Sequence, residues 1–183
     1  MNSPEVANII KKGGIGILPT DTLYGVVGSA FSKKAVTRLY KIKSRSHSKP
    51  LIILIPKFSW LKKFGVNDDG VADSVLKAEQ SYKGSISIIV PCSLSKFEYL
   101  HRGTKSLAFR VPKKKALRTL LEKTGPLVAP SANPQGMKPA STILEAKKYF
   151  GEHVDFYISG GKKVGKPSRV ISLLTGKPVI VRK

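Results

Sequence analysis

Short apolar runs alternate with amphipathic segments along most of the chain. Ile15–Leu18 and Leu51–Ile55 are unbroken apolar runs, a pattern typical of strands covered on both faces. Similar runs predict strands at 86–90, 107–111, 127–129 and 156–158. Apolar residues at helical spacing predict helices at 4–12, 32–43, 57–64, 71–79, 113–124 and 142–150. This alternation indicates an α/β fold.

Residues with capping and turn chemistry mark the ends of these segments. Ser3 and Pro4 are suited to begin the first helix, and Gly13 and Gly14 to end it. The stretches 169–174 and 178–182 flank Thr175-Gly176 and predict a C-terminal hairpin. Because a hairpin is antiparallel, we expect a twisted mixed sheet with flanking helices. No repeat or linker interrupts residues 1–183, so one domain is expected.

Composition narrows the partners and the compartment. The single cysteine, Cys92, excludes a disulfide framework within the chain and a site of several thiolates. The first residues lack the features of a signal peptide, and no apolar run approaches the roughly 20 residues that span a bilayer. A cytoplasmic protein without membrane contact is therefore expected. The net charge of +22 favours polyanionic partners such as nucleic acid or nucleotides, although high charge also serves solubility alone.

Three polar segments adjoin the predicted strands. The stretch 19–25, PTDTLYG, follows a strand, where α/β proteins place binding sites, although it is also an ordinary turn composition. The stretch 41–51 holds four cations that suit a triphosphate or an RNA backbone. The alternative is that they form a solvent-exposed basic helix end, which the helix dipole favours. The stretch 130–136, PSANPQG, offers a hydroxyl and an amide that can fix a carboxylate or phosphate. No clear general base accompanies Ser131, so we interpret it as a binding residue.

Other catalytic patterns are missing or incomplete. The three histidines, His47, His101 and His153, lack metal-ligand spacing and are expected at the surface, so no metal site is predicted. Residues 160–166 match G-x-x-x-x-G-K, but Pro167 stands where a P-loop needs Ser or Thr. We therefore expect a flexible Gly/Lys loop that covers a site rather than a P-loop.

Five motifs in order make the chain resemble the YrdC/Sua5/YciO family from about residue 8 to the end. They are PTDTLYG at 19–25, Lys43-Ser44-Arg45 with Lys49-Pro50-Leu51, the strand 106–112 ending in R-x-P, APSANPQG at 129–136, and Ser168 with Arg182. The resemblance is to the short YrdC form, without the C-terminal domain of Sua5. It implies a twisted α/β sheet with a basic concave face.

The resemblance also implies a reaction. Members of the family join L-threonine, bicarbonate and ATP into threonylcarbamoyl-AMP and pyrophosphate, and partner proteins of a transferase complex pass the group to adenosine 37 of tRNA. By position, threonine would be held by Thr22, Arg110, Ser131 and Ser168. ATP would be surrounded by Arg45, Lys49, Ser106, Ala129, Ser131, Asn133 and Arg182, with Lys43 and Arg45 acting on the phosphates. Mg²⁺ would accompany ATP, held chiefly by phosphates.

The chain departs from the family pattern at three places. Ser46 stands where a proline is usual, residues 83–87 replace P-G-P-x-T, and Arg169 follows Ser168 in place of threonine. An alternative is therefore a non-catalytic, YciO-like protein that binds RNA or tRNA on the same scaffold. A carbamoyl-transfer module is disfavoured, because zinc cysteines and accessory domains are missing.

Overall fold

The computed structural model describes residues 3–67, 69–82, 84–175 and 178–182, and its strands form one mixed sheet. The order across the sheet is β7-β1-β2-β6-β3-β5-β4-β8-β9. The pairs β1/β7, β3/β5 and β4/β8 are parallel and the other neighbours antiparallel, which confirms the predicted mixed α/β sheet. The bounds are β1 Ile15–Pro19, β2 Tyr24–Ser29, β3 Ile52–Leu54, β4 Ile86–Pro91, β5 Ser106–Arg110, β6 Leu127–Val128, β7 Phe156–Tyr157, β8 Arg169–Ser172 and β9 Val179–Arg182.

Helices cover both faces of this sheet. The α-helices are α1 Pro4–Lys11, α2 Lys33–Ile42, α3 Val71–Ser81, α4 Glu98–His101, α5 Lys115–Thr124 and α6 Ile143–Phe150. The 3₁₀ helices are η1 Phe58–Phe64, η2 Ser95–Phe97 and η3 Gly151–His153. Helices α1 and α5 pack with Leu18 and Val27, whereas α2 packs with the neighbouring residues Ile17 and Val26. Because successive strand residues point to opposite faces, these helices lie on opposite sides of the sheet.

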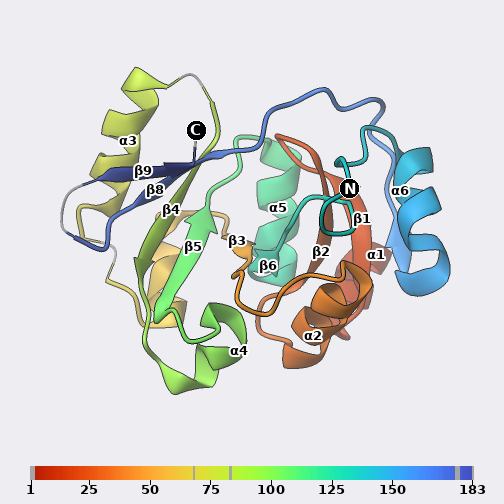
Figure 1. Cartoon of the computed structure of the whole chain (residues 1–183), viewed down its shortest axis with the longest axis horizontal. Helices are drawn as coiled ribbons and strands as arrows, with labels where there is room; N and C mark the ends of the chain where they lie inside the picture. The colour runs from red at the N-terminus through yellow and green to blue at the C-terminus, as the bar shows by residue number, and fades with distance from the viewer. Residues whose placement is uncertain (1–2, 68, 83, 176–177, 183) are drawn as a thin grey trace.

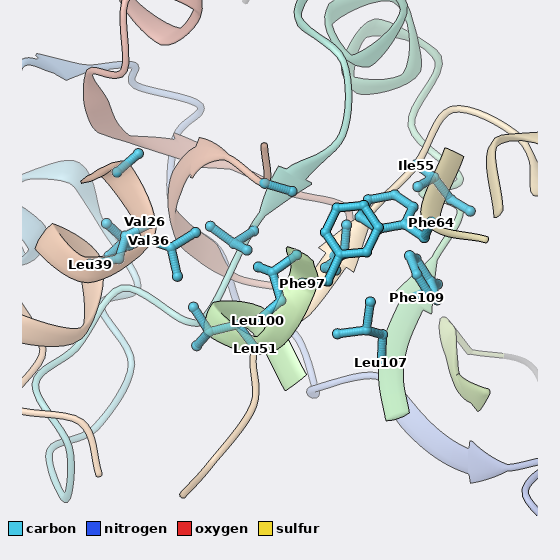
Figure 2. Packing of buried hydrophobic residues seen from close by; sticks show 14 of the residues in the cluster. Val26, Val36, Leu39, Leu51, Ile55, Phe64, Phe97, Leu100, Leu107 and Phe109 are labelled. Carbon is cyan, nitrogen blue, oxygen red and sulfur yellow. The ribbon is translucent and has the colours of Figure 1, made fainter. Parts of the chain in front are cut away.

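The larger core joins distant segments through aromatic contacts. The ring centroids of Phe64 and Phe109 lie 4.9 Å apart, and those of Phe64 and Phe97 lie 5.1 Å apart. Figure 2 shows these rings beside Leu107 and Ile55. The cluster packs η1 and η2 against β5, and it therefore fixes the strand that ends at Arg110.

Strand β2 was not predicted from the sequence, because glycines and a polar turn interrupt its apolar pattern. It pairs with β1 from Ile15↔Gly28 to Pro19↔Tyr24, so residues 20–23 are a hairpin turn. A Cβ at Gly28 would lie 2.9 Å from Ile15 Cγ2 and 3.2 Å from Leu39 Cδ1. Glycine is therefore what lets α2 approach this hairpin closely.

Some local details differ from the predictions. The predicted helix at 57–64 is a 3₁₀ helix from Phe58, and the short elements at 95–101 were not foreseen. Ser3 precedes α1 but its side chain makes no capping hydrogen bond, whereas Ser32 accepts one from Ala35 N. The predicted turn at 175–176 lies partly outside the described residues, as does Lys83 in the altered 83–87 stretch.

Residues 158–168, here called the crossing segment, carry the chain from one end of the sheet to the other. They leave β7, which is the outermost strand at one end, and enter β8, which is next to the opposite end. Figure 1 shows this segment in blue along the top of the view, running from the side of α6 to the side of α3. The crossing segment therefore has to pass the middle strands on its way between the two ends of the sheet.

Candidate functional site

A cavity of about 400 Å³ lies among the β1–β2 turn, the ends of β5 and β6, and the crossing segment. Eight of the eleven residues predicted for the site line it: Thr22, Arg45, Ser106, Arg110, Ala129, Ser131, Ser168 and Arg182. They come from stretches as far apart in the sequence as 22 and 182, so the fold gathers them. Lys43, Lys49 and Asn133 are not lining residues.

Three arginines give the cavity its charge, and none of its lining residues is an acid. Arg45 donates through Nε to Lys49 O and through Nη2 to Pro50 O, both at 3.1 Å. Arg182 donates to Ser168 O at 2.7 Å and to Ser168 Oγ at 3.2 Å. Burial, and then the charge of Arg45, lowers the pKa of Arg182, so the two cations repel each other. Such a wall attracts a multiply charged anion.

Arg110, at the end of β5, is the most enclosed of the three arginines, with 5% of its side chain exposed. Its Nη1 donates to Thr22 Oγ1 at 3.2 Å. Burial lowers its pKa, the nearby Asp21 raises it, and Arg182 lowers it further. Thr22 is itself held, because its hydroxyl lies 3.0 Å from Thr20 Oγ1, which donates to Leu23 O.

Lys43 lies in the protein interior, only 2% exposed, and not on the cavity wall. Its ammonium group donates to the backbone carbonyls of Ser131 and Asn133. Burial, and then Arg45, lowers the pKa of Lys43 to about 7. Lys43 thus ties the end of α2 to the 131–133 loop.

The 131–133 loop is rigidly bonded. Ser131 Oγ donates to Asn133 Oδ1 at 2.6 Å, and Asn133 Nδ2 donates to the carbonyls of Pro134 and Met137. The Asn133 amide is therefore occupied by its own loop. An amide oxygen is not a general base, so Ser131 has no activating partner there. This agrees with its interpretation as a binding residue.

On the β8 side, Ser168 is 2% exposed, and its hydroxyl lies 2.8 Å from that of Ser87. Ser106 donates to Thr104 Oγ1 at 3.3 Å, and both residues line the cavity. Lys49 is exposed, and its backbone carbonyl, rather than its ammonium, is what contacts Arg45. Lys49, which was predicted to bind ATP, is therefore not part of the cavity lining.

Two residues of the first motif had no predicted role. Tyr24 is fully buried, and its hydroxyl accepts from Gly160 N and donates to Gly161 O, both at 2.8 Å. It therefore joins the cavity to the crossing segment. Asp21 is paired with Arg110. Asp21 could have been singled out from the sequence because acids are rare in this chain, which has only eleven.

The crossing segment is not a P-loop, as predicted. It leads into strand β8 instead of a helix, and Pro167 lines the cavity. A Cβ at Gly165 would lie 2.3 Å from Thr22 O, so the segment rests directly on the β1–β2 turn. Lys163 N donates to Ser141 O at 2.7 Å, which holds the segment from the other side.

The surface position predicted for all three histidines was wrong for His101, which is 5% exposed. Its Nδ1 accepts from Gly103 N at 3.2 Å, so the imidazole supports the turn between α4 and β5. His47 and His153 are exposed, as predicted. Within the described part of the chain, no three His, Cys, Asp or Glu side chains gather in a way that would hold a metal ion. No helix there is long and apolar enough to cross a bilayer.

The three departures from the family pattern each make a contact in this structure. Ser46 N donates to Gln135 Oε1 at 2.9 Å, a bond that proline could not make. Ser85 Oγ donates to Asp21 Oδ2 at 2.8 Å. The Arg169 guanidinium lies 3.8 Å from the ring centroid of Tyr82. Ser85 and Arg169 are neighbours, since Arg169 N donates to Ser85 O.

Comparison with known proteins shows which family the chain resembles over most of its length. A protein-family model for Sua5, YciO and YrdC, described as "Telomere recombination", matches residues 8–183. A "Threonylcarbamoyl-AMP synthase" of Histophilus somni (strain 129Pt) is 29% identical over 180 residues, covering 98% of each chain. One of Pseudomonas fluorescens (strain Pf-5) is 32% identical over 181 residues, covering 96% of this chain and 94% of that protein.

Solved structures show the same fold. Sua5 of Pyrococcus abyssi, described as complexed with L-threonine, superposes with a TM-score of 0.86 at 28% identity. The match covers 97% of this chain and 52% of that one, so this chain spans about half the length of that Sua5. E. coli YciO superposes with a TM-score of 0.83 at 27% identity, covering 98% of this chain and 87% of that one.

Proposed function

This chain belongs to the Sua5/YciO/YrdC family, and on that basis we propose that it is an L-threonylcarbamoyladenylate synthase. The reaction joins L-threonine, bicarbonate and ATP, and it releases pyrophosphate. The observation that carries the proposal is the cavity itself, in which three arginines and the hydroxyls of Thr22, Ser131 and Ser168 meet with no acid among the lining residues. Such a lining suits two anionic substrates together.

Threonine is assigned to the end of the cavity formed by Arg110, Thr22 and Ser168. A carboxylate is best received by a guanidinium with hydroxyl donors beside it. Arg110 Nη1 already donates to Thr22 Oγ1, so these two side chains are held together without the ligand. Ser131 also lines the cavity and is assigned contacts to both substrates.

ATP is assigned to the side formed by Arg45 and Arg182, with Ser106, Ala129, Lys49 and Asn133 around it. Burial lowers the pKa of both arginines, and a phosphate beside them would favour their charged form. The lining residues include no carboxylate that could ligate Mg²⁺. Mg²⁺ would enter with ATP, held by phosphate oxygens and water.

The chain's own residues act by holding the reactants together and stabilising charge. The threonine amine attacks the carbon of bicarbonate, and a hydroxyl leaves that carbon as water with a proton from the amine, which gives a carbamate. A carbamate oxygen then attacks the α-phosphorus as pyrophosphate leaves. Neither step needs a protein nucleophile, since positioning supplies the advantage. Arg45 and Arg182 would stabilise the negative charge that grows on the leaving pyrophosphate. Lys43 would act on the phosphates only through the 131–133 loop that it holds.

The proposal is tested by pyrophosphate release from ATP with L-threonine and bicarbonate left out in turn. We expect release only when all three substrates are present. The control variant is Arg38→Ala, which removes an arginine that pairs with Asp155 and does not line the cavity, so it should release pyrophosphate as the wild type does. Release that continues without threonine would contradict the assignment, because ATP hydrolysis alone would then explain it.

A second function, RNA binding, is favoured by the net charge of +22. We propose that tRNA contacts the basic surface and that the cytoplasmic chain hands its adenylate to transferase-complex proteins for tRNA modification. Filter binding of tRNA from 50 to 300 mM KCl would test the contact. Each phosphate contact should add about −0.7 to −0.9 to the log–log salt slope. Tight tRNA binding without any adenylate formation would favour a non-catalytic, YciO-like role instead.

A further inference from the structure

Asp21, in the β1–β2 turn, is a buried acid with 7% of its side chain exposed. Its Oδ2 accepts from Ser85 Oγ at 2.8 Å and from Lys113 N at 3.3 Å. Its Oδ1 lies 3.4 Å from Arg110 Nη2 and has no hydrogen-bond partner of its own. Asp21 therefore touches the start of β4, the segment after β5, and the arginine at the cavity, but it is not a lining residue.

The pair matters because Arg110 is buried too. An unpaired charge in the interior is strongly disfavoured, so each member of a buried pair depends on the other. The Arg110 guanidinium has two anchors, with Thr22 Oγ1 on Nη1 and Asp21 Oδ1 beside Nη2. Each terminal nitrogen keeps a second N–H, and a guanidinium held in this way presents those donors in a fixed direction.

We propose that Asp21 is a positioning residue that sets the orientation of Arg110 for the carboxylate of the amino-acid substrate, and that Ser85 sets the orientation of Asp21. The inference rests on the proposed function and adds a role for two side chains that do not touch the substrate. The acid holds the arginine from behind the cavity wall. The substrate carboxylate then meets an arginine that needs no rearrangement.

Asparagine is the sharpest replacement for Asp21, because it keeps the shape and removes the charge. Ser85 Oγ and Lys113 N both donate to Oδ2, so the amide oxygen of asparagine takes that place. Its NH₂ group then faces Arg110 Nη2, and two donors oppose each other. Asp21→Asn therefore removes the ionic partner of Arg110, while a side chain of the same shape still fills the position of Asp21. Ser85→Ala removes one of the two bonds that hold the acid.

The experiment measures KM for L-threonine and for ATP in the full chain with Asp21→Asn and Ser85→Ala. We expect Asp21→Asn to raise the threonine KM about tenfold or more, with the ATP KM changed less than about twofold. Ser85→Ala should raise the threonine KM by about two- to fivefold. The control is Asp155→Asn, which removes an acid paired with Arg38 away from the cavity and should change neither KM.

A second measurement separates this inference from the proposed function. In ¹⁵N spectra the Arg110 Nη signals, assigned with Arg110→Lys, should be resolved in the wild type and merged in Asp21→Asn. Equal rises in both KM values, or Nη signals that Asp21→Asn leaves unchanged, would overturn the positioning role. If the wild type forms no adenylate, the proposed function fails, and the Nη signals alone then decide whether Asp21 orients Arg110.

Discussion

Replacing Lys43 by methionine tests whether this buried lysine supports the 131–133 loop. Methionine has about the same length and fills the same space, but it cannot donate a hydrogen bond. In the wild type, the Lys43 Nζ donates to the carbonyls of Ser131 and Asn133. In Lys43→Met both carbonyls lose this donor in the interior, beneath the cavity.

The structure gives the size and the pH dependence of the effect. Ser131 O keeps a hydrogen bond from Asn133 N at 3.0 Å, so it is chiefly the Asn133 carbonyl that is left short of a donor, at a cost of about 1–3 kcal/mol of unfolding free energy. A neutral amine still has two N–H groups, enough for both carbonyls. The pKa of Lys43 falls from 10.5 to about 7 on folding, so between these values the unfolded chain binds more protons. Stability contributed by Lys43 therefore rises with pH, by about 2 kcal/mol from pH 7 to pH 9.

The assay is urea unfolding followed by circular dichroism at pH 7, 8 and 9, for the wild type, Lys43→Met and Lys41→Met. Lys41 lies in the same helix but is exposed, so its replacement should change the unfolding free energy by less than about 0.5 kcal/mol at every pH. The loss in Lys43→Met should be larger at pH 9 than at pH 7. A loss that does not change with pH, or that equals the Lys41→Met value, would refute the reasoning.

Three further outcomes are expected. Arg45→Ala should raise the ATP KM about tenfold or more, and because it also loses the bonds to Lys49 O and Pro50 O it should lower the free energy of unfolding by about 1–3 kcal/mol, as kinetics and urea unfolding would show; an unaltered ATP KM would contradict its assignment. Gly165→Ala places a Cβ 2.3 Å from Thr22 O and should destabilise the fold by about 1–3 kcal/mol, whereas Gly161→Ala, with nothing within 4 Å, should cost about 1 kcal/mol from its φ of +72°. Equal losses in thermal unfolding would argue against the close contact. Burial raises the pKa of the Cys92 thiol, so Ellman's reagent at pH 8 should label it only after urea unfolding, and rapid labelling of the native chain would contradict its burial.

The class of fold could be predicted because it follows from local patterns, whereas the eight predicted site residues that line the cavity were assigned from the resemblance to the family. Unbroken apolar runs such as Ile15–Leu18 need only nearest-neighbour information, and the motifs at 19–25 and 129–136 mark the ends of strands. Strand β2 could not be predicted in this way. Its glycines lower the apparent strand propensity, and the reason for Gly28 is the approach of α2, which is a tertiary contact.

The same limit applies to the surroundings of Lys43 and His101, which the sequence could not predict. Lys43 falls in a basic stretch that suits phosphate binding, yet its partners lie 88 and 90 positions further along the chain. His101 stands on a four-residue helix too short to show a periodic pattern, and its burial follows from the turn that it supports. In each case the decisive partner was a backbone atom, which no side-chain pattern marks.

The most direct test of the central claim is the path of carbon from bicarbonate. The purified chain is incubated with ATP, L-threonine and ¹³C-bicarbonate, and the products are separated and weighed by mass spectrometry. We expect threonylcarbamoyl-AMP carrying one ¹³C atom, formed only with threonine present and strongly reduced in Arg110→Ala. Pyrophosphate or AMP appearing without any ¹³C-labelled adenylate would contradict the account.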